Sequence, residues 1–372
     1  MILIAPDKFK STFKASETAE LIESSLHTFL PEIQTYRLPL ADGGEGSCEL
    51  LAEYFNAKPV NLSVSDPLMR SINTNYYYSE SSKTALIETA KASGLYLLSE
   101  NEKNPLQTNS YGSGELMADA IKKGAKALIV TLGGSAVNDA GAGLAHALGF
   151  QFYDADKRSV FPVGKTIGDI REVDHSKVKY NLSNIQIIVL SDVENPLYGE
   201  KGASKVFAKQ KGANNQEVEL LENSIMHFSQ ILEKYKPGIS CRKGAGAAGG
   251  MAAGLSAFCG AQIQSGSDFI IEKTNFENHI KKAELLITGE GKLDSQSFDG
   301  KLVGKLLQKA KKMNKKTAVI CGINELKGNE KNLNTGVYAL FDKETSILKA
   351  QAETPEKIHK AVRTLLKDFK YL

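Results

Sequence analysis

Short apolar runs alternate with amphipathic helical segments at the start of the chain. Residues 2–5 form a continuous apolar run, which is typical of a strand buried on both faces of a parallel sheet. A helix with its apolar residues on one stripe is expected to begin near Ser16, a residue type that caps helices well. Residues 35–40 predict a second strand, and a helix follows through 50–54. The order strand, helix, strand, helix indicates a parallel α/β sheet.

The same alternation returns at the other end of the chain. Apolar runs at 285–288, 318–321 and 337–341 predict three strands. Helical patterns at 302–312 and 355–369 lie between and after them. Together with the two N-terminal strands, these segments predict one five-stranded, doubly wound sheet.

The middle of the chain has another pattern. Residues 60–90 alternate in polarity and are rich in Ser, Asn and Tyr, as antiparallel strands are. A strand-and-helix stretch around 115–132, a strand at 185–190 and a long helix near 216–235 follow. A length of 372 residues allows about two domains, so we expect a second domain inserted into the first. The expected bounds are 1–60 with 284–372 for the first domain and 61–283 for the inserted mixed α/β domain.

Composition and charge narrow the class of protein. Lys plus Arg is 46 and Asp plus Glu is 43, and a net charge of +3 is too small to indicate a nucleic-acid partner. No apolar run reaches the roughly 20 residues of a membrane span, and the N-terminus resembles neither signal peptide nor anchor. Four cysteines without CxxC spacing or a nearby His are expected to be reduced thiols in a cytoplasmic protein: Cys48, Cys241, Cys259 and Cys321.

Two familiar nucleotide-binding motifs are matched only in part. The segment 244–249 fits GxGxxG, but the preceding residues are turn-like and basic instead of a strand, so a dinucleotide site is not expected. Residues 163–166 resemble the end of a P-loop, but Ser159 stands where the first glycine of that motif belongs.

Charged residues embedded among glycines follow three of the predicted strands. In an open parallel sheet the loops beyond the carboxyl ends of the strands form the ligand crevice, so these loops are expected to converge. Glycines expose N–H groups to phosphate, carboxylates can hold Mg²⁺, and lysines can neutralise phosphoryl oxygens. A plain turn remains an alternative for any single loop, but paired lysines directly after a buried strand favour a site. The residues concerned are Asp7, Lys8, Lys10, Asp42, Glu45, Gly289 and Glu290.

Two further loops follow strands of the inserted domain. The sequence GGSAVNDAG at 133–141 follows a strong strand and continues into a helix, as a nucleotide-phosphate cradle would. Close helix packing on small residues is the alternative. Asp192 follows the strand at 185–190 and could be a metal ligand or the base for a hydroxyl proton, with a structural turn equally open.

Taken together, these loops resemble those of a known family, the type I glycerate kinases, and the resemblance runs nearly from end to end. The matching segments, in chain order, are APDKFK (5–10), ADGGEG (41–46), DPLMR (66–70), TAKASGL (89–95), NPLQTNSYGSGEL (104–116), GGSAVNDAGAG (133–143), SDVENPLYGEKGASKVFAKQKGA (191–213), GAGAAGGMAAG (244–254) and TGEGKLDSQS (288–297). The resemblance implies a flavodoxin-like domain with an inserted mixed α/β domain. It also implies an ATP- and Mg²⁺-dependent kinase that phosphorylates D-glycerate, commonly to 2-phosphoglycerate in bacterial members.

The chain departs from the family pattern at four places. Ser11 and Met69 stand where the family usually has Gly, and Ser191 stands where it has Cys or Ala. A family proline is missing after Lys301. These departures lie beside the matched polar residues, so they bear on substrate preference more than on the reaction.

From the loops and the resemblance we expect ATP and Mg²⁺ to bind between the two domains, with Asp192 as the first choice for the base. Arg70 offers a guanidinium that can bind the glycerate carboxylate in bidentate fashion. The expected roles are catalysis for Asp192, Lys8 and Asp42; substrate binding for Lys10, Arg70, Asp7 and Glu45; cofactor binding for Gly133, Gly134, Ser135, Asn138, Gly289 and Glu290; and metal binding for Asp42, Asp192 and Glu290.

Several alternatives stay open at this point. The same chemistry could act on the 3-hydroxyl or on another small hydroxy acid. A non-catalytic sensor of nucleotides or small acids is a second class of function. The oligomeric state is open, with a homodimer as one candidate.

Overall fold

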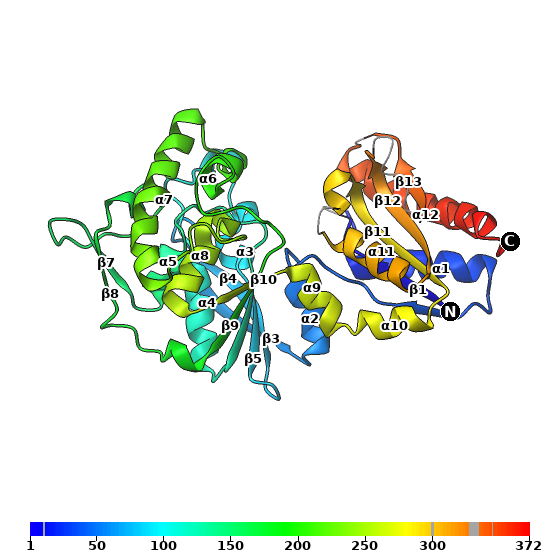
Figure 1. Ribbon diagram of the computed structural model, residues 1–372, viewed down its shortest axis with the longest axis horizontal. Helices are drawn as coiled ribbons and strands as arrows, with labels where there is room; N and C mark the ends of the chain where they lie inside the picture. Colours follow the sequence, from blue (N-terminus) through cyan, green and yellow to red (C-terminus); the bar gives the residue numbers. More distant parts are fainter. Residues whose placement is uncertain (10–11, 299–300, 327–334, 344) are drawn as a thin grey trace. The chain divides into compact units, whose positions relative to one another are not determined.

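The computed structural model describes residues 1–9, 12–298, 301–326, 335–343 and 345–372. It divides into two compact units, Met1–Asp42 with Ser267–Leu372 and Gly43–Gly266 (Figure 1). Each unit carries its own sheet. No helix in the described ranges is both long enough and apolar enough to cross a bilayer.

The first unit is built on a five-stranded parallel sheet in the order β13-β12-β11-β1-β2. Numbered within the unit, this is the order 2-1-3-4-5 of flavodoxin-like folds, the fold that the family resemblance implied. The elements of this unit are β1 (Ile2–Pro6), α1 (Ala15–Phe29), β2 (Thr35–Arg37), α9 (Gly266–Lys273), α10 (Phe276–Lys282), β11 (Leu285–Leu293), η6 (Ser295–Phe298), α11 (Leu302–Lys312), β12 (Lys316–Asn324), β13 (Thr335–Phe341) and α12 (Ile347–Asp368).

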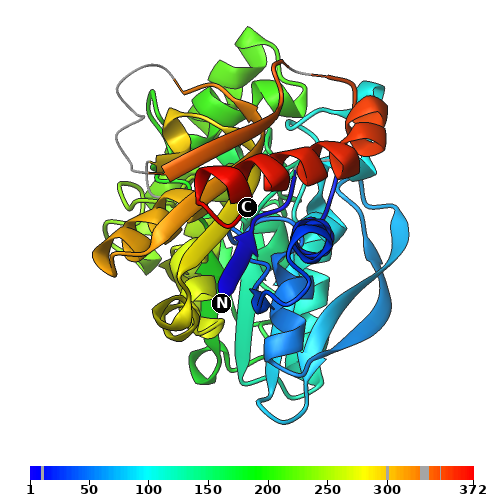
Figure 2. The same cartoon turned by 90° about the vertical axis from the view of Figure 1, so that its right-hand side faces the viewer.

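Helices cover both faces of this sheet, which explains the continuous apolar runs of its strands. Ile320 of β12 lies in one core cluster with Ile22 of α1 and Val362 of α12. Figure 2 shows α12 (red) beside α1 (blue). The next residue, Cys321, faces the other way and packs with Leu307 of α11. The period of two along the strand thus separates the two helical layers.

The second unit contains a six-stranded mixed sheet in the order β10-β9-β6-β5-β4-β3. The hairpins β3-β4 and β4-β5 are antiparallel, as expected for 60–90, whereas β5, β6, β9 and β10 run parallel. The elements are α2 (Ser47–Tyr54), β3 (Lys58–Ser65), β4 (Ser71–Ser79), β5 (Thr84–Glu88), α3 (Ala90–Ser93), η1 (Leu95–Leu97), η2 (Glu100–Glu102), α4 (Tyr111–Lys122), β6 (Ala127–Thr131), α5 (Ala142–Ala147), β7 (Gln151–Tyr153), η3 (Ile167–Asp169), β8 (Glu172–Asp174), η4 (Leu182–Asn184), β9 (Gln186–Leu190), α6 (Ala203–Phe207), η5 (Lys209–Lys211), α7 (Asn215–Tyr235), α8 (Ala247–Cys259) and β10 (Gln262–Gln264).

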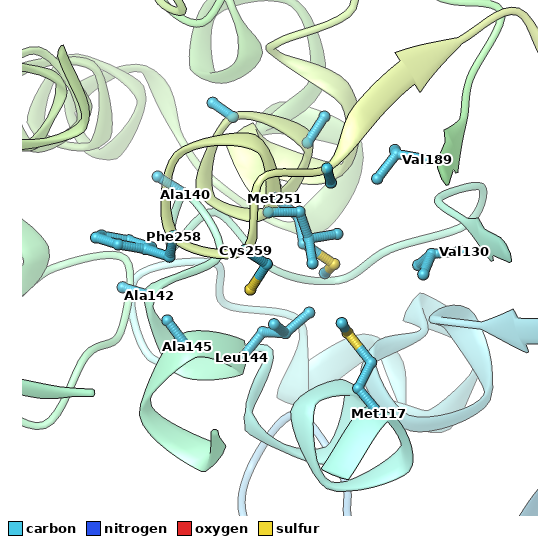
Figure 3. Packing of buried hydrophobic residues seen from close by; sticks show 14 of the residues in the cluster. Met117, Val130, Ala140, Ala142, Leu144, Ala145, Val189, Met251, Phe258 and Cys259 are labelled. Carbon is cyan, nitrogen blue, oxygen red and sulfur yellow. The ribbon is translucent and has the colours of Figure 1, made fainter. Parts of the chain in front are cut away.

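Small residues bring the helices of this unit close together. A Cβ at Gly114 of α4 would lie 2.4 Å from the carbonyl oxygen of Leu144 in α5, so only glycine fits there. The core around this contact includes Met117 of α4 and Phe258 of α8 (Figure 3). Cys259 also lies in it, and burial raises the pKa of its thiol to about 12, so it acts as an apolar packing residue. All four cysteines are free thiols, as their spacing predicted.

The two units divide the chain earlier than the sequence boundaries at 60/61 and 283/284. Helix α2 goes with the second unit because Cys48 lies 3.7 Å (Sγ to Oγ1) from Thr131 of β6. Helices α9 and α10 go with the first unit because Asp268 and Glu277 form ion pairs of 2.7 Å and 2.6 Å with lysines of α11. An amphipathic helix near a domain boundary has the same sequence pattern whether it packs on the sheet of one domain or of the other.

Candidate active site

In the first unit, three carboxylates gather near the carboxyl end of β1. Strand β1 ends at Pro6, which pairs with Gly289 of β11, so Asp7 and Glu290 come next on adjacent strands. The Leu40 amide donates to the Pro6 carbonyl oxygen at 3.0 Å, which brings the segment leading to Asp42 alongside. The sheet therefore places Asp7, Asp42 and Glu290 together, as expected for the three segments that contain them.

One part of that prediction was wrong in detail. Gly289 and Glu290 were expected in a loop after a strand at 285–288, but β11 continues to Leu293. Its partner β12 supplies backbone hydrogen bonds as far as Asn324. A Cβ at Gly289 would come within 2.1 Å of the Ile320 carbonyl oxygen, so this glycine serves close strand pairing. The sequence Gly289-Glu290-Gly291 is typical of a turn, but in this structure it lies within strand β11, where glycine allows close pairing with β12.

Burial and repulsion between neighbouring acids raise the pKa values of Asp7 and Glu290. The pKa of Asp7 is raised well above its usual value, first by burial and then by Asp42, with Glu290 adding to it and Lys8 opposing it. Burial raises the pKa of Glu290 to about 7, with Asp294 and Asp42 as lesser causes. Ser297 and Lys301 oppose that shift. The buried Oε1 atom of Glu290 has no hydrogen-bond partner in the part of the chain that the structure describes.

This cluster has the donor type that Mg²⁺ takes, since oxygen ligands from carboxylates are its usual protein partners. A cation would relieve the repulsion between Asp42 and Glu290 and give the buried Oε1 atom of Glu290 a partner. Within the described ranges, however, no three His, Cys, Asp or Glu side chains form a ready metal-binding group. The third expected ligand, Asp192, belongs to the second unit. Lys10 lies outside the described residues.

In the second unit, the 133–138 loop follows β6 and is held by backbone hydrogen bonds. The Leu95 amide donates to the Gly134 carbonyl oxygen at 2.9 Å, and the Ala136 amide donates to Ser93 at 2.8 Å. Gly134 has a φ of +72°, which few other residues tolerate. A Cβ at Gly133 would lie 2.9 Å from the Cα of Gly44, so the loop that contains Glu45 packs directly on this turn.

Asp192 lies at the end of the neighbouring strand β9, which pairs with β6. Its Oδ1 atom accepts a 2.8 Å hydrogen bond from the Ser265 hydroxyl. A Cβ at Gly43 would lie 3.4 Å from the Cβ of Leu190, the last residue of β9. The structure therefore brings the 133–138 loop, Asp192 and the 43–45 loop to one edge of this sheet, with Glu45 exposed.

A buried polar layer, which sequence reasoning missed, lies under the 133–138 loop. The Asp139 carboxylate accepts four hydrogen bonds of 2.7–3.1 Å, from the amide and hydroxyl of Ser110 and from the amides of Gly141 and Gly143. Burial nevertheless raises its pKa. The ammonium of Lys211 donates to the Val137 carbonyl oxygen at 2.7 Å. In sequence, nothing separates Lys211 from the exposed lysines around it.

Asn138 is fully buried within this layer. Its amide nitrogen donates to the Ser204 hydroxyl at 3.1 Å, whereas its Oδ1 atom has no partner among the described residues. The hydrogen bond to Ser204 ties the 133–138 loop to α6. The expectation that Asn138 touches a cofactor stays a prediction.

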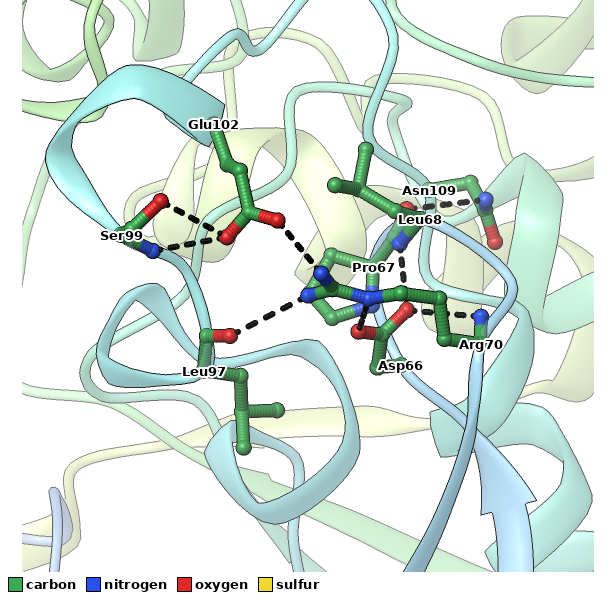
Figure 4. Close-up of polar contacts among 8 residues, drawn as sticks. All are labelled: Asp66, Pro67, Leu68, Arg70, Leu97, Ser99, Glu102 and Asn109. Carbon is green, nitrogen blue, oxygen red and sulfur yellow. Dashed lines mark hydrogen bonds and ion pairs between the residues drawn. The ribbon is translucent and has the colours of Figure 1, made fainter.

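Arg70 has its guanidinium engaged by protein groups (Figure 4). Its Nε donates to the buried Asp66 carboxylate at 2.6 Å, its Nη1 to Glu102 at 2.5 Å and its Nη2 to the Leu97 carbonyl oxygen at 3.3 Å. These contacts fasten the turn at 66–70 to the 95–102 segment. Met69, where the family has Gly, takes a φ of +66°, which explains why glycine suits that position.

The glycine cluster at 244–249 also has a packing role. A Cβ at Gly249 would lie 2.0 Å from the Val137 carbonyl oxygen, and one at Gly246 would lie 2.3 Å from that of Pro196. The cluster thus lets the start of α8 rest against the backbone of the 133–138 loop.

Comparison with known proteins identifies the family of this chain. A model of the glycerate kinase family matches residues 2–370. The chain belongs to the glycerate kinase family. The expectation of a kinase of this type is confirmed by that membership.

Relatives and a solved structure are similar over most of their length. Glycerate 2-kinase of Escherichia coli K12 is 39% identical over 322 residues, which cover 86% of this chain and 84% of the relative. A glycerate kinase of Bacillus cereus is 38% identical over 311 residues, covering 83% and 82%. A crystal structure assigned as a glycerate kinase 2 from Salmonella typhimurium LT2 has a TM-score of 0.81 at 34% identity and covers 100% and 99% of the two chains.

Proposed function

We propose that this member of the glycerate kinase family transfers the γ-phosphoryl group of ATP to the 2-hydroxyl of D-glycerate and requires Mg²⁺. Family membership over 2–370 and the 39% identity to a glycerate 2-kinase support the substrate and the product. The observation that carries the proposal is the arrangement in the second unit. There a glycine-rich turn and the carboxylate of Asp192 end two adjacent parallel strands, β6 and β9.

Phosphoryl transfer depends mainly on positioning and on stabilising charge, and the second unit supplies groups for both. In our proposal the Gly133–Ser135 turn holds the phosphates of ATP, because its glycines let the backbone approach an anion closely. Asp192 accepts the proton of the glycerate hydroxyl as the oxygen attacks the phosphorus. The hydrogen bond from the Ser265 hydroxyl to Asp192 Oδ1 orients this carboxylate.

The first unit contributes charge to the same reaction in this proposal. Asp42 and Glu290 would hold Mg²⁺, which when bound neutralises negative charge on the phosphates. Lys8 follows Asp7 at the end of β1 and would offset the phosphate or carboxylate charge, with Lys10 in the same role. Arg70 is held by Asp66 and Glu102, so we assign it a structural role in the 66–70 turn. We assign binding of the glycerate carboxylate to Lys8 and Lys10 instead.

Purified protein incubated with ATP, Mg²⁺ and D-glycerate tests the proposal through formation of ADP. We expect ADP to form only when all three are present, and to fall to background when L-glycerate replaces the D-isomer. Binding of ATP or glycerate without turnover would favour a sensor instead. Turnover with another small hydroxy acid at higher kcat/KM would keep the chemistry and change the substrate. A cytoplasmic location and a homodimer remain predictions.

A further inference from the structure

Lys211 is a lysine buried where a loop is expected to bind phosphate. It ends η5 in the second unit and is 3% exposed, whereas Lys209 in the same short helix is exposed. Its Nζ atom donates to the Val137 carbonyl oxygen at 2.7 Å and to the Ser135 hydroxyl oxygen at 3.2 Å. Both acceptors belong to the 133–138 loop. Lysines are rarely buried to this extent, so this position calls for a specific reason.

Burial disfavours the charged form of Lys211, and the nearby Asp139 carboxylate partly offsets this effect. Burial lowers the pKa of its ammonium to about 8, and the negative charge of Asp139 opposes that shift. The carboxylate of Asp139 is itself occupied by four hydrogen bonds from Ser110, Gly141 and Gly143. Lys211 therefore has the loop as its hydrogen-bonding partner, and its charge is placed beneath Ser135.

The hydrogen bond to Ser135 determines what this hydroxyl can do. An ammonium group has only donors, so the Ser135 oxygen must accept from Lys211. A hydroxyl that accepts in this way keeps its own proton for another acceptor, and the nearby positive charge makes it a better donor. A phosphate oxygen is the kind of acceptor that a glycine-rich turn at the end of a parallel strand receives.

We propose that Lys211 is a positioning residue that fixes the 133–138 loop and directs the Ser135 hydroxyl towards a phosphate oxygen of ATP. This inference rests on the proposed function in taking ATP as the ligand. Lys211 acts through Ser135 and Val137, and it does not itself touch the nucleotide. If Lys211 were purely structural, its replacement would affect the stability of the fold and would not affect ATP binding through Ser135.

Two substitutions and their combination separate these roles. K211M keeps the length of the side chain and removes its charge and donors, S135A removes the hydroxyl, and K209M changes an exposed lysine of the same helix as a control. ATP binding is measured by titration calorimetry without glycerate. We expect K211M and S135A each to weaken ATP binding by about 10–100-fold, the range for loss of a hydrogen bond to a charged group. The double variant should be no weaker than the weaker single variant, because both changes remove one interaction. K209M should bind like the wild type.

Kinetic constants supply the second readout. K211M should raise KM for ATP by a similar factor, with KM for D-glycerate within about twofold of the wild-type value. ATP binding by K211M equal to that of K209M would overturn the inference. So would losses in K211M and S135A that multiply in the double variant. If K211M does not fold, S135A alone decides, since wild-type ATP affinity in S135A would also overturn the proposal.

The same set distinguishes this inference from the proposed function. Wild-type protein that binds ATP but does not phosphorylate D-glycerate would refute the proposed function, and the binding series would still test the coupling of Lys211 to Ser135. Wild-type protein that phosphorylates D-glycerate, with K211M indistinguishable from K209M in both readouts, would refute this inference alone.

Discussion

The main-chain N–H of Asp7 donates a 2.8 Å hydrogen bond to the carbonyl oxygen of Gly289. This bond joins the end of β1 to β11 directly before Glu290, and so keeps the carboxylates of Asp7 and Glu290 on neighbouring strands. Burial and the surrounding acids then raise the pKa of both groups. These raised pKa values make the stability of the first unit sensitive to pH.

Glu290 should make the folded protein less stable as pH rises. Its pKa is about 7 in the folded state against a usual value of 4.5, so the folded state binds more protons between these values than the unfolded state does. The favourable contribution is therefore complete below about pH 4.5 and is lost as pH rises through about 7. E290Q should remove it, and relative to the wild type it should gain roughly 2–3 kcal/mol between pH 5 and pH 8.

Chemical denaturation of the wild type and E290Q at both pH values measures this difference. E277Q, which changes an exposed glutamate of α10 in the same unit, is the control and should show no such gain. Equal stability differences at pH 5 and pH 8 would show that Glu290 ionises normally.

Mg²⁺ should counteract the repulsion within the same cluster. At pH 8 the carboxylate of Glu290, with a pKa of about 7, is mostly charged, and a bound cation stabilises the folded state by mass action. We expect millimolar Mg²⁺ to raise the unfolding temperature of the wild type, and to raise that of D42N and E290Q clearly less. A thermal-shift series with Mg²⁺ and no nucleotide measures this. Equal shifts in all three proteins would place the metal elsewhere.

Much of the architecture could be predicted from the sequence because the three central strands of the first unit, β1, β11 and β12, are buried on both faces over most of their length. Their continuous apolar runs separate clearly from the amphipathic helices around them. The extent of β11 could not be predicted in this way. Gly289 and Gly291 look like turn residues, and only the pairing of β11 with β12 as far as Asn324 shows that the strand continues.

The candidate site could be predicted where charged residues follow strands. It could not be predicted where tertiary contacts determine the partners or the burial of a charged side chain. Asp7 and Asp192 follow the ends of β1 and β9, as their positions in the sequence indicated, whereas β2 already ends at Arg37, five residues before Asp42. The partners of Arg70 and the burial of Lys211 depend on segments distant in the chain. Charged side chains of the same type give the same pattern whether they face solvent, an ion pair or the protein interior.

Replacing Asp192 should affect catalysis far more than binding. If Asp192 is the base, D192N should lower kcat by roughly 10²–10⁴-fold and leave KM for ATP nearly unchanged, because the amide cannot accept the proton. E194Q is a matched control, since Glu194 is exposed and its ion pair with Lys243 lies at the surface. Steady-state kinetics measure both variants. A D192N enzyme with kcat within threefold of the wild type would remove Asp192 from this role.

A methyl group at Gly133 should disturb nucleotide binding through the loop geometry. In G133A the new Cβ would lie 2.9 Å from the Cα of Gly44 and 3.1 Å from the amide nitrogen of Glu45, so one loop must move. We expect KM for ATP to rise by at least about tenfold, comparable to the loss of one good hydrogen bond to phosphate. G238A is the control, because Gly238 has open space around it although its φ is +80°. Unchanged ATP kinetics in G133A would show that this turn does not bind nucleotide.

Arg70 should prove structural. R70Q removes the donors that reach Asp66 and Glu102, so it should lower the unfolding temperature while KM for D-glycerate stays within about twofold of the wild type. R171Q, at an exposed arginine whose guanidinium donates to the nearby carbonyl oxygens of Gly168 and Ile170, is the comparison. A large rise in KM for D-glycerate in R70Q would instead support bidentate binding of the substrate carboxylate.

The central claim is that the chain phosphorylates the 2-hydroxyl of D-glycerate with ATP. ³¹P NMR of a reaction containing purified protein, ATP, Mg²⁺ and D-glycerate tests it most directly. Our account predicts a growing resonance that coincides with added 2-phosphoglycerate, at the same rate at which ADP appears. A resonance that coincides with 3-phosphoglycerate, or ATP left unchanged by protein that binds it, would contradict the claim.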